Sequence, residues 1–146
     1  MSTAEGVVPA PAAARARGLA GPAGLALAGV AFAVLLRLRD PRVPGAYGFC
    51  PFRALTGLWC PGCGGLRAAG HLTNGEVLAS LASNPFVAPL ALVLVLAWLG
   101  WVRRRWRGAD GRMIVLSPAA SVMVLAALGG FTIVRNTPWG SVLAPT

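Results

Sequence analysis

The sequence has few groups that could perform acid–base or hydrolytic chemistry. Among its 146 residues there is no lysine, one histidine, and only four acidic side chains, Glu5, Asp40, Glu76 and Asp110. Charged residues make up 12% of the chain, against about 25% in ordinary soluble domains. It has no Ser/His/Asp grouping, glycine-rich phosphate loop or paired carboxylates. The shortage of charge excludes a free cytosolic globule, and the shortage of acid–base groups leads us to expect a non-catalytic protein.

Apolar residues are abundant instead, at 56% of the chain with a mean hydropathy of +0.68. Three apolar runs approach the length of about 20 residues that a helix needs to cross a bilayer. These runs cover residues 18–36, 85–102 and 113–134. The pattern predicts an all-α membrane protein with three transmembrane helices.

The length permits one domain, and the segments outside the spans differ in composition. Residues 1–17 are rich in alanine and proline, and we expect them to form a disordered cytoplasmic tail. We expect residues 18–146 to form a single membrane domain. Between its first and second spans, residues 43–84 would form a cysteine-containing loop with short interfacial helices.

The arginines indicate how the chain crosses the membrane. Thirteen arginines give a net charge of +9, and they lie at the edges of the apolar runs, which suits topology signals better than nucleic-acid binding. Residues 103–112 carry five of them and are expected in the cytoplasm, although Arg37, Arg39 and Arg42 then lie on the side that the positive-inside rule disfavours. The N-terminus would be cytoplasmic, and the cysteine loop and C-terminus extracytoplasmic. The expected partners are the bilayer and another membrane protein or a second copy, with no nucleic acid.

All three cysteines, Cys50, Cys60 and Cys63, lie between the first two spans. If a helix begins at Cys60, Pro61 takes its first position, and both Cys60 and Cys63 lie near free backbone N–H groups and the positive end of the helix dipole. That environment lowers the pKa of a thiol. Arg67, four residues after Cys63, would add to the effect.

Four interpretations of the cysteines are open. In a thiol–disulfide couple, Cys60 would be the exposed thiolate and Cys63 the resolving thiol. A structural disulfide would pair Cys50 with Cys60 or Cys63 and leave one thiol over. Adding His71 gives the four ligands that zinc prefers, but on one continuous helix Cys63 and His71 are about 12 Å apart, so the helix would have to break. In the fourth interpretation the cysteines are small apolar packing groups. We expect no cofactor, with zinc as the alternative.

The residues after the cysteines are best explained as helix ends. His71 is expected in the last turn of a helix, where it meets free carbonyl groups. Residues 73–76, Thr-Asn-Gly-Glu, predict a capping box for a second short helix that reaches Ser83, so Glu76 is a cap rather than a catalytic acid. Asn84 and Pro85 predict the N-cap and first position of the second span.

The cysteines belong to a longer pattern. Cys60-Pro61-Gly62-Cys63-Gly64 and Arg67-Ala68 form the signature C-P-x-C-G-x-x-R-A, and Asn84-Pro85 and Arg135-Asn136 follow it. In this pattern, over residues 37–144, the chain resembles a bacterial membrane-protein family catalogued as domain of unknown function 2752, with Leu66 where that family often has threonine. The resemblance implies a small integral membrane protein with a shared cysteine loop and no established activity.

From these observations we expect an accessory protein of the bacterial cytoplasmic membrane. Its Cys-Pro-Gly-Cys loop would dock or stabilise a protein partner at the extracytoplasmic surface. The alternative is a membrane thiol–disulfide or metal-binding protein that uses Cys60 and Cys63, with Arg67 beside them. A transporter or channel is disfavoured, because no ionisable residue lies inside an expected span.

Overall fold

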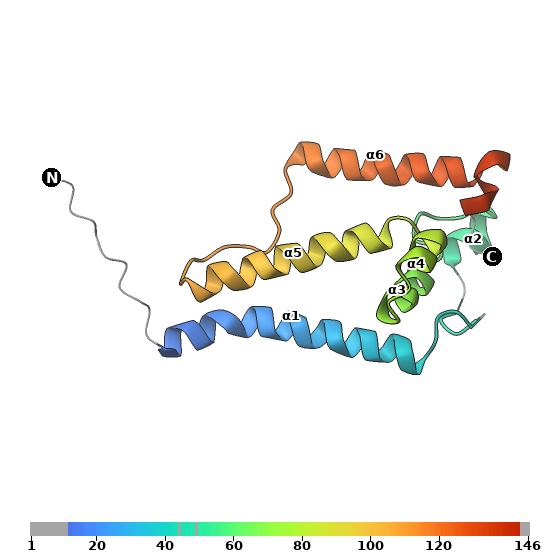
Figure 1. Cartoon of the computed structure of the whole chain (residues 1–146). Helices are drawn as coiled ribbons and strands as arrows, with labels where there is room; N and C mark the ends of the chain where they lie inside the picture. The colour runs from blue at the N-terminus through green and yellow to red at the C-terminus, as the bar shows by residue number, and fades with distance from the viewer. Residues whose placement is uncertain (1–11, 44, 49, 144–146) are drawn as a thin grey trace.

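The computed structural model describes residues 12–43, 45–48 and 50–143, and every regular element among them is helical. The long helices are α1 (Ala12–Leu38), α5 (Val87–Trp106) and α6 (Pro118–Arg135). Three short helices, α2 (Pro51–Thr56), α3 (Gly65–Thr73) and α4 (Val77–Ser83), lie between α1 and α5, and a 3-10 helix, η1 (Pro138–Leu143), follows α6 (Figure 1). The predicted all-α architecture with three membrane helices is confirmed.

Three helical segments are long and apolar enough to cross a membrane. They are Gly18–Leu38 within α1 and the whole of α5 and α6, with mean hydropathies of 2.1, 1.6 and 1.6. At most 11% of the apolar window of any of these segments is buried by the rest of the chain. Apolar side chains left so uncovered require lipid around them, so the chain is a multi-pass membrane protein.

Local capping explains where the long helices begin. The hydroxyl oxygen of Ser117 accepts the Ala120 N–H at 3.2 Å, and Pro118 takes the first helical position, so α6 begins five residues after the start expected at 113. The Asn84 side-chain oxygen accepts the Phe86 N–H at 3.0 Å, which forms a turn and delays α5 to Val87.

The first helix begins earlier than expected. Residues 12–17, assigned from the sequence to the disordered tail, are the start of α1, and their Ala-Arg composition has high helix propensity. The tail expected over residues 1–11 lies outside the described residues.

Packing among α1, α3, α4 and α5 organises the membrane domain. α1 packs on α5, where Trp98 donates its indole N–H to the Pro22 carbonyl at 3.0 Å. α3 and α4 pack on each other, and both pack against α5. The cysteine segment lies at one end of the molecule and the α5–α6 link at the other, and the ribbons of α5 and α6 are furthest apart at the link end (Figure 1). The functional candidates are therefore collected at one end of the bundle.

The capping box predicted over residues 73–76 is wrong. Thr73 donates its hydroxyl to the Gly70 carbonyl at 2.7 Å and so helps to close α3, whereas Glu76 takes the N-cap position of α4 without a side-chain capping bond. The Glu76 carboxylate pairs with His71 and lies 3.8 Å from an Arg42 nitrogen. The His71 ring and the Arg42 guanidinium lie against this carboxylate, which therefore does not cap the backbone of α4.

Candidate functional site

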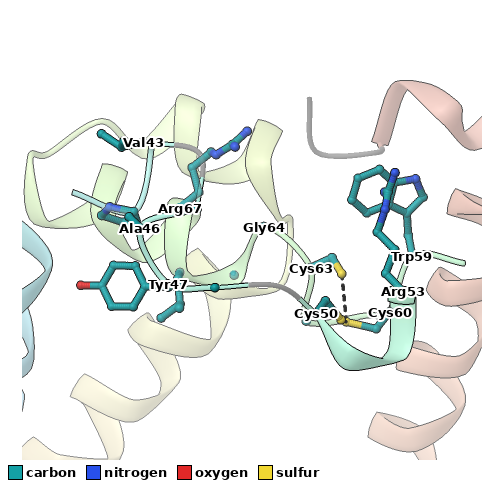
Figure 2. A pocket seen from close by; sticks show the side chains of 16 residues that line it. Val43, Ala46, Tyr47, Cys50, Arg53, Trp59, Cys60, Cys63, Gly64 and Arg67 are labelled. Carbon is teal, nitrogen blue, oxygen red and sulfur yellow. Dashed lines mark hydrogen bonds between the residues drawn. The ribbon is translucent and has the colours of Figure 1, made fainter. Parts of the chain in front are cut away.

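The sulfur atoms of Cys50, Cys60 and Cys63 converge on one point, all within 4.8 Å of one another. The Sγ atoms of Cys60 and Cys63 are 3.1 Å apart, and those of Cys50 and Cys60 are 3.6 Å apart (Figure 2). Since a disulfide bond measures about 2.05 Å, no pair is at bonding distance and all three thiols are free. Cys63 is buried, and the other two are half-buried.

Short turns, rather than a helix, position the cysteines. Cys50 is the N-cap residue of α2, with Pro51 at the first helical position. The Cys63 N–H donates to the Cys60 carbonyl at 3.1 Å, so the Cys-Pro-Gly-Cys segment is a turn. The prediction of a helix beginning at Cys60 is wrong, because Gly64 adopts a left-handed conformation, with φ of 79°, and α3 begins only after it.

The thiols differ in acidity. Burial raises the pKa of Cys63 to about 12, and its hydrogen bond with the Cys60 thiol adds to the effect. This direction is opposite to the lowering expected for Cys63 from a helix start. At Cys50 the backbone N–H of Arg53, in the first turn of α2, lowers the pKa. The Cys50 thiol, outside the Cys-x-x-Cys pair, is therefore more acidic than the buried Cys63 thiol.

Two buried polar side chains hold the backbone of the cysteine turn. Asn84, 2% exposed, donates its amide to the Pro61 carbonyl at 2.9 Å and to the Cys63 carbonyl at 3.3 Å. Arg135, 1% exposed at the end of α6, donates from one guanidinium nitrogen to the Cys60 and Cys63 carbonyls, each at 3.1 Å. The residue that ends the short helix α4 and the last residue of the membrane helix α6 thus fix the turn through its carbonyl groups.

Asn136 adds a third attachment. Its side-chain oxygen accepts the Trp59 N–H at 2.8 Å, and its amide donates to the Trp59 carbonyl at 2.9 Å. Its amide also donates to the Thr132 carbonyl at 2.8 Å within α6. The Arg53 guanidinium lies over the Trp59 ring, 3.2 Å from its centroid, which joins α2 to the same anchored segment.

Two other predicted site residues lie apart from the sulfur atoms. His71 is in the last turn of α3, as predicted, and its Nδ1 atom pairs with Glu76. The structure therefore brings together three of the four predicted zinc ligands, all cysteines, without His71. The Arg67 side chain lies apart from the sulfur atoms, on the side of the pocket where Val43 and Ala46 lie (Figure 2).

A pocket of about 480 Å³ opens beside the three cysteines. Its described lining combines all three thiols with two arginines, two aromatic rings and several glycines (Figure 2). The residues that give it chemical character are Cys50, Cys60, Cys63, Arg53, Arg67, Tyr47 and Trp59. The volume is in the range of small-molecule sites.

Sequence reasoning did not single out α2 or the pocket residues Tyr47, Arg53 and Trp59. The signal for α2 was present, because Cys50-Pro51 has the form of an N-cap followed by proline at the first helical position. The pocket left no such signal, since its walls come from segments that only the fold brings together.

The site coincides with a known family segment. Residues 50–98 match the family model described as "Protein of unknown function (DUF2752)". This segment belongs to the DUF2752 family. The DUF2752 segment contains the three cysteines and Asn84, whereas Arg135 and Asn136 lie beyond it in the chain. No curated protein and no solved structure matches the chain.

Proposed function

We propose that this protein binds one soft metal ion, Zn²⁺ in the first instance, through the thiolates of Cys50, Cys60 and Cys63 at the membrane surface. The convergence of three sulfur atoms within 4.8 Å carries the proposal. At a metal–sulfur length of about 2.3 Å, tetrahedral ligation places sulfur atoms about 3.8 Å apart. Small movements of the thiols from their separations of 3.1 and 3.6 Å would reach that geometry.

The surroundings of the cluster also suit a metal–thiolate centre. A bound cation replaces the thiol protons and compensates the thiolate charge that burial makes unfavourable at Cys63. One divalent ion with three thiolates carries a net charge of −1, and the buried Arg135 guanidinium lies against the carbonyls of two of its ligands. Thiolate ligands select soft or borderline ions such as Zn²⁺ or Cu⁺ over Mg²⁺ and Ca²⁺.

The test is a titration of the full chain, purified in detergent without oxygen and with its thiols reduced, with Co²⁺ as a spectroscopic probe for Zn²⁺. We expect one Co²⁺ per chain with a thiolate-to-cobalt charge-transfer band, and displacement of Co²⁺ by Zn²⁺. The Cys50→Ser variant should lose about a third of the band, because serine preserves the N-cap of α2 while it removes one thiolate.

The matched control is His71→Ala, which removes the remaining predicted ligand without touching the cluster. It should leave the band and the metal stoichiometry unchanged. Absence of the band in the reduced wild-type protein would refute the proposal, and so would loss of metal in His71→Ala with the fold intact. A Cys60–Cys63 disulfide that forms and is reduced reversibly, in a chain that binds no metal, would favour the thiol–disulfide interpretation instead.

A second candidate function is docking of a membrane-protein partner at the cysteine loop, favoured by the apolar side chains that surround it. Leu55 of α2 is 87% exposed and Trp139 of η1 is 93% exposed. Such residues suit a protein interface or the lipid headgroup region. A photo-crosslinker at Leu55 should give one discrete protein adduct in native membranes if docking occurs, whereas adducts with lipid alone would refute it.

A further inference from the structure

The pocket lies directly beside the three cysteines. All three cysteines line it, whereas none of the residues that hold the turn, Asn84, Arg135 and Asn136, does so. The side chains that anchor the turn are thus not part of the pocket wall, whereas the three cysteines are. A ligand in the pocket would meet the sulfur side of the cluster.

The number of ligands leaves room for such a partner. Structural zinc sites are closed by four protein ligands, whereas sites with three protein ligands keep the fourth position for an exchangeable group. The described group of metal-binding side chains here consists of three cysteines. The fourth position of a bound ion would therefore be filled from the pocket.

Charge defines the rest of the ligand. Among the described residues that line the pocket there are two arginines and no carboxylate. Arg53 is held over the Trp59 ring, and Arg67 lies at the opposite end of the pocket, near Val43 and Ala46 (Figure 2). A guanidinium group pairs with a carboxylate through charge-assisted hydrogen bonds.

We propose that the pocket takes a small thiol that carries a carboxylate, with its sulfur in the fourth coordination position of the metal and its carboxylate toward Arg53. This inference rests on the proposed metal-binding function. In the binding step the ligand S–H bond breaks and its proton goes to solvent, a water molecule leaves the metal, and a metal–sulfur bond forms. No electron is transferred.

The test compares the binding of a charged thiol and of its uncharged analogue to the Co²⁺-loaded full chain. β-Mercaptopropionate and β-mercaptopropionamide differ only in the carboxylate. We expect β-mercaptopropionate to add a fourth thiolate contribution to the cobalt spectrum and to bind about tenfold more tightly than the amide, after correction for their thiolate fractions. A tenfold preference corresponds to about 1.4 kcal/mol.

The Arg53→Gln variant should keep its Co²⁺ stoichiometry and lose the preference for the carboxylate. The control, Arg107→Gln, changes an exposed arginine beyond the end of α5 and should keep the preference. Equal affinity for the two thiols, an unchanged cobalt spectrum, or removal of Co²⁺ from the protein by the thiol would overturn the inference while leaving the metal function intact. Failure of the reduced chain to bind Co²⁺ would overturn the metal function itself.

Discussion

Asn84 provides the sharpest test of how the cysteine turn is held. The substitution Asn84→Asp replaces the amide nitrogen by oxygen and changes almost nothing in shape. It removes the donor to the Pro61 carbonyl at 2.9 Å and to the Cys63 carbonyl at 3.3 Å, but keeps an oxygen for the Phe86 N–H. The Cys63 carbonyl retains its bond from Arg135 at 3.1 Å, so the larger loss falls on Pro61.

The expected cost follows from these contacts. Two hydrogen bonds contribute about 1 kcal/mol each, and loss of the donor to the half-buried Pro61 carbonyl adds about 1 kcal/mol. The total of about 3 kcal/mol lowers the melting temperature by about 6–12 °C for a chain of this size. Thermal unfolding in detergent, followed by tryptophan fluorescence and by alkylation of the buried Cys63, measures the change.

The effect of Asn84→Asp should depend on pH. Burial beside the Pro61 carbonyl raises the carboxyl pKa in the folded state above its unfolded value of about 3.9, and we expect this effect to outweigh the opposing one of the Arg135 guanidinium, which donates to the same Cys63 carbonyl. Below the pKa of the unfolded state, the carboxyl group is protonated in both states and can donate to one carbonyl, so the loss of stability is smallest there. The loss of stability grows as the pH rises through the pKa of the folded state. Asn74→Asp, the same change at an exposed position, is the control. A shift at Asn84 no larger than that at Asn74 would refute the assigned role.

Two further predictions concern packing and thiol acidity. Gly70→Ala should lower the free energy of unfolding by about 1–3 kcal/mol, because its Cβ atom would lie 2.7 Å from the Pro41 Cγ atom. The control Gly29→Ala, at a position with open space around it, should have little effect on the melting temperature. Equal effects of the two substitutions would contradict this packing. In the reduced, metal-free protein, N-ethylmaleimide should modify Cys50 before Cys63 at neutral pH, and the rate of Cys63 modification should keep rising toward pH 12. Peptide mass spectrometry measures both rates. The reverse order of modification would contradict the pKa directions.

The membrane helices could be predicted from the sequence because apolar length is a local property. The later start of α6 was also readable, since Ser117-Pro118 is a strong capping pair. The start of α3 was not, because glycine accepts both helical and left-handed backbone, and only the fold selects φ of 79° at Gly64. This error placed Cys60 and Cys63 in a helix, whereas the structure has them in a turn.

The convergence of Cys50 on the other two cysteines required the fold as well. Sequence spacing limits how far Cys50 lies from Cys60, but it does not determine the direction of either side chain. Likewise, the family pattern named Asn84, Arg135 and Asn136 without their contacts, which lie 21 to 77 residues away in the chain. Such long-range pairs depend on how the membrane helices pack, and no local pattern encodes that.

The placement of the buried polar groups explains why the sulfur atoms remain available. Asn84 and Arg135 bind carbonyl oxygens of the turn, so they fix its position without using a sulfur atom. Arg135 also ends α6, a helix whose ribbon is furthest from α5 at the link end and which therefore depends on its C-terminal contacts for its position at this end of the molecule (Figure 1). Since one guanidinium nitrogen holds both Cys60 and Cys63, movement of α6 would displace two of the three proposed ligands together. The position of the third membrane helix and the geometry of the thiol cluster are thus coupled through Arg135, and through Asn136 at the neighbouring Trp59.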